Sequence, residues 1–81
     1  MDAKLNITFQ GQNGALPDPM SYDATDADVR QIGTEAVRAG SVPGIPAFLE
    51  ADFTDFVVDR FPATGDLPNR LMLRAKVPFG A

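Results

Sequence analysis

The sequence has 81 residues, 44% of them apolar, which is enough to bury one small core and too apolar for general disorder. It contains no cysteine and no histidine, which excludes disulfides, cysteine zinc sites and the side chain that most often acts as a base near neutral pH. The net charge of −4 argues against nucleic acid as a partner, and the lack of a signal peptide or a long apolar run predicts a cytoplasmic protein without membrane contact.

Alternating apolar side chains predict a first strand over residues 4–10. Leu5, Ile7 and Phe9 share one face and the residues between them are polar, so one side of this strand should be buried. Two glycines then predict a hairpin turn over residues 11–14, because glycine adopts positive φ without strain.

A return strand is expected over residues 15–22. It contains Pro17 and Pro19, which have no backbone N–H to donate to a neighbouring strand. This segment therefore belongs at the edge of a sheet rather than in its middle.

One helix is expected over residues 26–39. Thr25 is a suitable N-cap with Asp28 three residues after it, and Gly40 suits the position that follows the last helical residue. The apolar stripe expected to pack on the sheet consists of Val29, Ile32, Ala36 and Val37. Gly33 lies within that stripe, which indicates a close approach of the helix to the sheet.

The connection over residues 41–52 is too apolar for a free loop, so it should pack on the core. Residues 53–61 predict a third strand with apolar side chains on both faces, and a loop over residues 62–68 follows. Residues 70–77 alternate cleanly and predict the final strand. Its core-facing residues would be Leu71, Leu73, Ala75 and Val77, and its outward-facing residues Arg70, Met72, Arg74 and Lys76.

These elements predict an α+β fold in which the first and last strands lie side by side and parallel in the centre of the sheet. The helix provides the crossover that parallel strands require, and the strand with the prolines takes an edge. The expected architecture is a β-grasp: a mixed four- to five-stranded sheet packed on one helix. A ferredoxin-like half or another two-layer α+β sandwich is the alternative.

The sequence resembles the ubiquitin-like family in three places along nearly the whole chain. A hairpin begins close to the N-terminus, and Thr25-Asp-Ala-Asp-Val-Arg30 is similar to the helix opening common in the family. Residues 71–81 are similar to the alternating strand and glycine-containing tail of ubiquitin-like modifiers. The resemblance implies a single ubiquitin-like β-grasp domain over residues 1–81 with a short tail, 78–81, and bacterial ubiquitin-like modifiers are the nearest candidates.

The resemblance also implies where the function lies. Gly80 would be the residue whose carboxylate is activated by an adenylating enzyme, after a peptidase removes Ala81, and a conjugating enzyme would assist its transfer to a lysine amine. On the outer side of the last strand, Met72, Arg74 and Lys76 would bind protein partners. The protein would act as a modifier or a protein-binding module and not as an enzyme.

The acidic residues provide a second candidate site, and two further functions are alternatives to this hypothesis. The acidic residues between positions 50 and 66 do not have the spacing of a calcium loop, so a solvated surface is expected there, with neither a metal nor a cofactor. A structural or adaptor domain of a larger assembly, without tail chemistry, is the first alternative function. A sulfur carrier is the second, because such carriers share the fold and the glycine tail.

Overall fold

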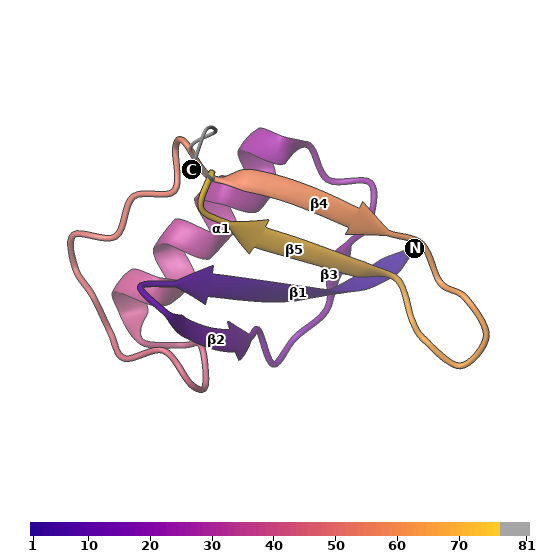
Figure 1. Cartoon of the computed structure of the whole chain (residues 1–81), viewed down its shortest axis with the longest axis horizontal. Coiled ribbons are helices and arrows are strands. Elements are labelled where there is room, and N and C mark those ends of the chain that lie inside the picture. Colours follow the sequence, from indigo (N-terminus) through magenta and orange to yellow (C-terminus); the bar gives the residue numbers. More distant parts are fainter. Residues whose placement is uncertain (77–81) are drawn as a thin grey trace.

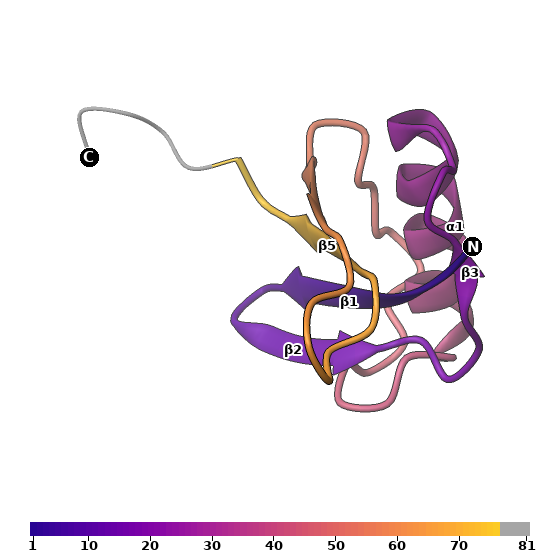
Figure 2. The same cartoon turned by 90° about the vertical axis from the view of Figure 1, so that its right-hand side faces the viewer.

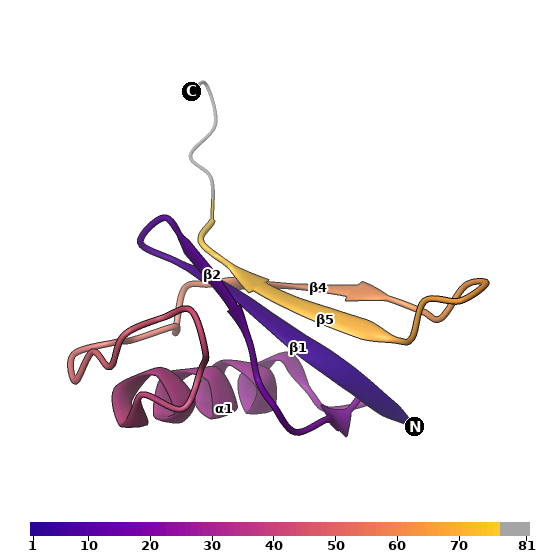
Figure 3. The ribbon, with the colours of Figure 1, turned by 90° about the horizontal axis from the view of Figure 1, so that it is seen from below.

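The computed structural model describes residues 1–76, which form one sheet with one helix packed on it (Figure 1). Along the chain the elements are β1 (Asp2–Phe9), β2 (Gln12–Ala15), β3 (Met20–Ser21), α1 (Asp26–Ala39), β4 (Val57–Phe61) and β5 (Arg70–Arg74). The strands lie side by side in the order β2-β1-β5-β4, and β3 also pairs with β1. Figures 2 and 3, turned about different axes, both show α1 on one side of the sheet. The fold is therefore α+β with a mixed five-stranded sheet, as the sequence predicts.

The most regular strands occupy the centre of the sheet. β1 and β5 run parallel, with Leu5 opposite Leu71 and Ile7 opposite Leu73, and all four side chains are buried. β2 and β3 pair with β1 in the antiparallel direction, and β4 pairs with β5 in the same way. The expected parallel pairing of the first and last strands is confirmed.

Helix α1 has the bounds that its capping residues predict. At its start, Thr25 Oγ1 accepts a hydrogen bond of 3.1 Å from the backbone N–H of Asp28. At its end, Gly40 adopts a positive φ of 70°, a conformation in which alanine would be strained. Its N–H donates to backbone carbonyls of the last turn. Within the described residues, no helix has the length and apolar character needed to cross a membrane.

Removal of the N-cap hydroxyl provides a direct test of the helix start. Thr25→Ala is expected to lower the free energy of unfolding by about 1 kcal/mol, because the N–H of Asp28 loses its acceptor. The matched control is Thr25→Ser, which keeps a hydroxyl at the same place and should unfold close to wild type. Urea denaturation followed by circular dichroism measures both variants. An equal loss of stability in Thr25→Ala and Thr25→Ser would contradict the assignment of Thr25 as the N-cap.

The face of α1 that meets the sheet is built from Val29, Gly33 and Val37, all of which are buried. Ile32 and Ala36 flank this stripe and are half-buried, so the expected stripe was correct in its side of the helix but not in its centre. A Cβ atom at Gly33 would overlap Leu73 Cδ2 and lie 3.1 Å from Phe53 Cδ2. The glycine thus allows the close approach of helix and sheet that the sequence indicated.

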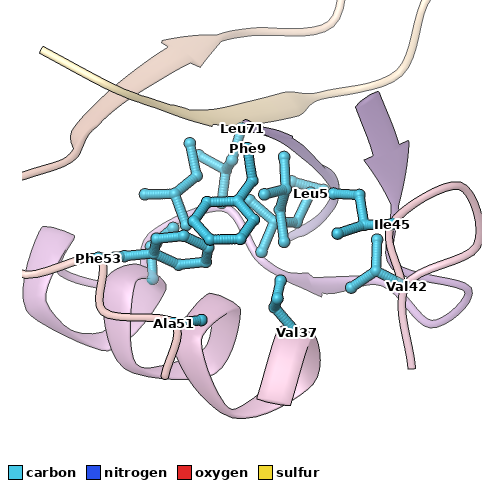
Figure 4. Packing of buried hydrophobic residues seen from close by; sticks show 12 residues of the cluster. Leu5, Phe9, Val37, Val42, Ile45, Ala51, Phe53 and Leu71 are labelled. Carbon is cyan, nitrogen blue, oxygen red and sulfur yellow. The ribbon is translucent and has the colours of Figure 1, made fainter. Parts of the chain in front are cut away.

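The core lies between α1 and the sheet, and the long connection after the helix closes it (Figure 4). Val42, Ile45 and Ala51 from that connection are buried, which confirms that it packs on the core. Phe53 is the largest fully buried side chain. Its ring meets that of Phe9 edge-on, with 5.1 Å between the ring centroids, so the aromatic centre of the core joins β1 to the segment before β4.

The N-terminal hairpin differs from the expectation in its register. The turn consists of Gln10 and Gly11, both with positive φ, and Gly14 lies within β2. A two-residue turn of this kind matches the right-handed twist of the paired strands. Gly14 is instead required because a Cβ atom there would overlap the carbonyl oxygen of Pro43.

The single return strand expected over residues 15–22 is also wrong: the segment is divided between the end of β2 and the two-residue β3. Pro17 and Pro19 lie between the two pieces, where no ladder N–H is needed. Backbone pairing with β1 resumes in β3, where Met20 lies opposite Ala3, and extends to Tyr22, whose N–H donates to the carbonyl of Met1 at 2.8 Å.

Both C-terminal strands are shorter than expected. β4 begins at Val57 rather than at residue 53, because Phe53 turns inward to fill the core. β5 ends at Arg74, and Ala75 is exposed rather than buried. Val77, the expected last residue of the strand, lies outside the described residues.

Candidate functional site

The face of the sheet that points away from α1, called the outer face below, carries the predicted partner-binding residues of β5. Because Leu71 and Leu73 are fully buried towards the helix, the alternation of the strand places Met72 and Arg74 on the opposite side. Figure 3 shows α1 and the connection that follows it on one side of the sheet only. The predicted orientation of Met72 and Arg74 is therefore confirmed.

The strand register arranges the outer face in rows. One row crosses three strands and contains Phe61 on β4, Arg70 on β5 and Lys4 on β1. The next row contains Asp59, Met72 and Asn6, and the antiparallel partner of Asn6 on β2 is Ala15. Met72 thus occupies the middle of the outer face, with polar or charged neighbours in its row.

Arg74 is paired within the protein. Its Nε donates to Asp59 Oδ2 at 2.5 Å across β4 and β5, and both side chains are about one-third exposed, at 38% and 32%. The hydrogen bond to Asp59 and the charge of that carboxylate raise the pKa of Arg74 above its usual range, which favours the charged guanidinium. The charge of Arg74 is therefore largely neutralised before any partner approaches.

Arg70 has a different environment in the neighbouring row. Its guanidinium carbon lies 5.1 Å from the centroid of the Phe61 ring, a cation–π arrangement, and its Nε is buried without a hydrogen-bond partner. Lys4, the parallel partner of Arg70, is exposed. In residues 1–76 the ion pairs are Arg60–Asp26 and Arg74–Asp59, so the charges of Lys4 and Arg70 have no counterion there.

A shallow hollow of about 330 Å³ lies beside Met72 on the outer face. The short side chain of Ala15 on β2 leaves this space, and Asn6, Thr8 and Asn13 line it as well. Its surface is mostly apolar, and Thr8 Oγ1 donates to Asn13 Oδ1 at 2.8 Å. A small apolar side chain has a fitting chemical environment here.

Lys76, the third predicted partner-binding residue, does not lie beside Met72. It is exposed, follows the end of β5, and lines a separate hollow at the start of β4 together with Arg30, Asp55 and Val57. The structure therefore brings Met72 and Arg74 together but places Lys76 apart from them. Gly80 and Ala81, the predicted processing and conjugation residues, lie outside the described residues.

The cations on the helix side of the sheet are used to hold the fold together. Arg30 Nε donates to the carbonyl of Phe56 and Arg38 Nε to that of Ala51, both at 2.8 Å. Arg60 donates to the carbonyls of Tyr22 and Ala24 and to the carboxylate of Asp26, at 2.7, 2.6 and 2.7 Å. The role of Arg60 was not predicted from the sequence. The available signal was that Arg60 lies at a position of β4 whose side chain faces the helix.

The acidic segment before β4 forms a local turn. Thr54 donates both its backbone N–H and its hydroxyl to Asp52 Oδ1, and these hydrogen bonds, together with the nearby charge of Arg38, lower the pKa of Asp52. Within residues 1–76 there is no group of three or more acidic side chains that could hold a metal ion. Asp52 therefore has a structural role in this turn.

Comparison with known proteins gives no relative from which a function could be transferred. No family model matches the chain, and no curated protein and no solved structure is significantly similar to it.

Proposed function

We propose that this protein is a ubiquitin-like β-grasp domain. The support is the strand order β2-β1-β5-β4 with parallel central strands, the N-terminal hairpin and the helix that crosses between β3 and β4. The helix opening from Thr25 and the sequence of the last strand resemble the same family.

Its proposed role is that of a protein-binding module or protein modifier without enzymatic activity of its own. The observation that carries this proposal is Met72, placed in the middle of a sheet face that no other part of residues 1–76 covers. Methionine adapts to differently shaped surfaces, and cations surround it on β5 and β1. A mixed apolar and charged face of this kind suits a protein partner rather than a small molecule.

The tail provides the proposed chemistry of modification. A peptidase would remove Ala81, and an adenylating enzyme would use ATP to convert the carboxylate of Gly80 into an acyl adenylate with release of pyrophosphate. A lysine amine of the target, assisted by a conjugating enzyme, would then displace AMP and form an isopeptide bond. Glycine suits this role because it has no Cβ to obstruct the approach of an enzyme.

Mass spectrometry of the protein recovered from its source cells tests the tail chemistry. The expected result is a species that has lost Ala81, together with peptides in which Gly80 is joined to a lysine side chain. A thiocarboxylate at Gly80 would favour the sulfur carrier instead. If every recovered molecule were full-length and unconjugated, this result would contradict modification and favour the structural or adaptor domain.

The outer face is tested separately by substitution of Met72. Met72→Asp is expected to keep the melting temperature within a few degrees of wild type, because the side chain lies away from the core, while weakening partner binding. Leu71→Asp, one position earlier, is the matched control and should unfold the domain by burying a carboxylate. Thermal melts distinguish the two; unfolding by Met72→Asp would contradict the assigned face.

A further inference from the structure

Positive charge is distributed unevenly over this acidic protein. Of its seven lysine and arginine residues, Arg30, Arg38 and Arg60 donate to backbone carbonyls on the helix side. Arg74 is neutralised by Asp59. Lys76 lies apart from the others, which leaves Lys4 and Arg70 as adjacent cations in one row of the outer face. Among residues 1–76, the adjacent cations of the outer face that no carboxylate pairs with are therefore Lys4 and Arg70, whereas the sequence predicts a cationic cluster at Arg70, Arg74 and Lys76.

Arg70 is held in place for binding. Its side chain is stacked on Phe61, so less rotamer entropy remains to be lost when a ligand binds. Its Nε is buried without a hydrogen-bond partner among residues 1–76, and its two Nη nitrogens make no hydrogen bond within that range. These Nη groups and the exposed ammonium of Lys4 are the donors that an approaching carboxylate meets first.

The apolar hollow begins two residues further along the same two strands. It is lined by Asn6 and Met72, which follow Lys4 and Arg70 by two residues on β1 and β5. Two residues of a strand correspond to about 7 Å. The edge of the hollow at Asn6 and Met72 is therefore about 7 Å from the Lys4–Arg70 row along the strands, which is the spacing of residues i and i+2 in an extended chain.

We propose that the outer face binds an acidic protein segment in which an aspartate or glutamate stands two positions from an aliphatic residue. The carboxylate pairs with Lys4 and Arg70, and the aliphatic side chain fills the hollow beside Met72. This inference rests on the proposed protein-binding function and specifies the chemistry of the partner. Charge complementarity supports it: the bound segment meets two cations that have no counterion within residues 1–76, on a protein whose net charge is −4.

Titration of the full chain with short peptides, followed by amide chemical shifts, tests the proposal. The probe is an acetylated and amidated peptide containing Glu-Thr-Leu, and its controls contain Gln-Thr-Leu and Glu-Thr-Ser. The expected result is saturable shifts at residues 4–8, 14–15 and 70–72 with the first peptide, and weaker binding of both controls. Raising the salt concentration should weaken the first peptide, because exposed charges are screened.

Two variants of equal net charge identify the cations responsible. Arg70→Gln should lower the affinity for the Glu-Thr-Leu peptide by a factor of about three, the size expected for an exposed ion pair. Arg38→Gln removes the same charge far from the outer face and should leave the affinity unchanged. Arg74→Gln combined with Asp59→Asn removes the internal pair without altering the net charge and should also have no effect.

Three results would overturn the proposal: no shifts on the outer face at millimolar peptide, equal binding of the glutamine peptide, or equal weakening by Arg70→Gln and Arg38→Gln. These results are separate from a failure of the proposed function. If Met72→Asp still abolishes binding to a natural partner, the outer face is a binding surface for a partner of other chemistry. If Met72→Asp has no effect on that partner, the outer face itself is wrongly assigned.

Discussion

Phe53→Ala is expected to lower the free energy of unfolding by about 3–5 kcal/mol, the range for removal of a fully buried aromatic side chain. The ring lies between α1 and the sheet and contacts Phe9 and Phe56 at centroid distances of 5.1 and 4.5 Å. Its loss would leave a cavity at the centre of the core. Because an 81-residue domain has modest stability, the variant should be largely unfolded near body temperature.

Phe61→Ala removes the same group from the outer face and is the matched control. Phe61 is 38% exposed and its ring lies 5.1 Å from the guanidinium carbon of Arg70, so the expected loss is only about 1 kcal/mol. Chemical denaturation of both variants, with the slope against urea checked for two-state behaviour, measures the difference. Similar losses in the two variants would contradict the assignment of Phe53 to the core and Phe61 to the surface.

The position of Phe53 could not be predicted from the pattern of residues 53–61. Phe53 and Val57 share one parity and Phe56 and Val58 the other, so alternation alone predicts a strand that is apolar on both faces. In the structure the first part of this segment is not a strand. Phe53 N–H donates to Thr34 Oγ1 of α1 at 3.3 Å, and this tertiary contact turns the ring inward before β4 begins.

Other parts of the fold follow from local chemistry and were predictable for that reason. The bounds of α1 are encoded by Thr25 and Gly40, whose caps depend on residues within one turn. The alternation around Leu5 and Leu71 identifies two strands with one buried face each. Their parallel pairing then follows from the single helix between the two halves of the described chain.

In the candidate site too, features that depend on local sequence were predictable, whereas features that depend on the pairing of distant strands were not. The outward direction of Met72 was predictable because Leu71 and Leu73 determine the parity of β5. The pairing of Arg74 with Asp59 was not, because it depends on the register of β4 against β5. For the same reason the alternation of the first strand does not reveal that Lys4 lies beside Arg70 in the sheet.

The second large effect is expected at Gly33, where helix propensity and packing oppose each other. Alanine is favoured over glycine in a helix by about 1 kcal/mol, so propensity alone predicts that Gly33→Ala stabilises α1. The added Cβ would overlap Leu73 Cδ2 and press on the Phe53 ring, and such overpacking costs about 1–3 kcal/mol. Because both neighbours are fully buried and cannot move into solvent, we expect net destabilisation, measured by urea denaturation.

Truncation of Leu73 identifies the cause of that loss. Leu73→Ala alone should cost about 2–5 kcal/mol, because it creates a cavity under α1. In the Leu73→Ala background the methyl group of Gly33→Ala no longer meets Cδ2, so the second substitution should be neutral or stabilising, the reverse of its sign in wild type. Equal effects of Gly33→Ala in both backgrounds would mean that the glycine is not required by the contact with β5. A change of sign would show that this contact sets the distance between helix and sheet, because it is the only part of the environment of Gly33 that differs between the two backgrounds.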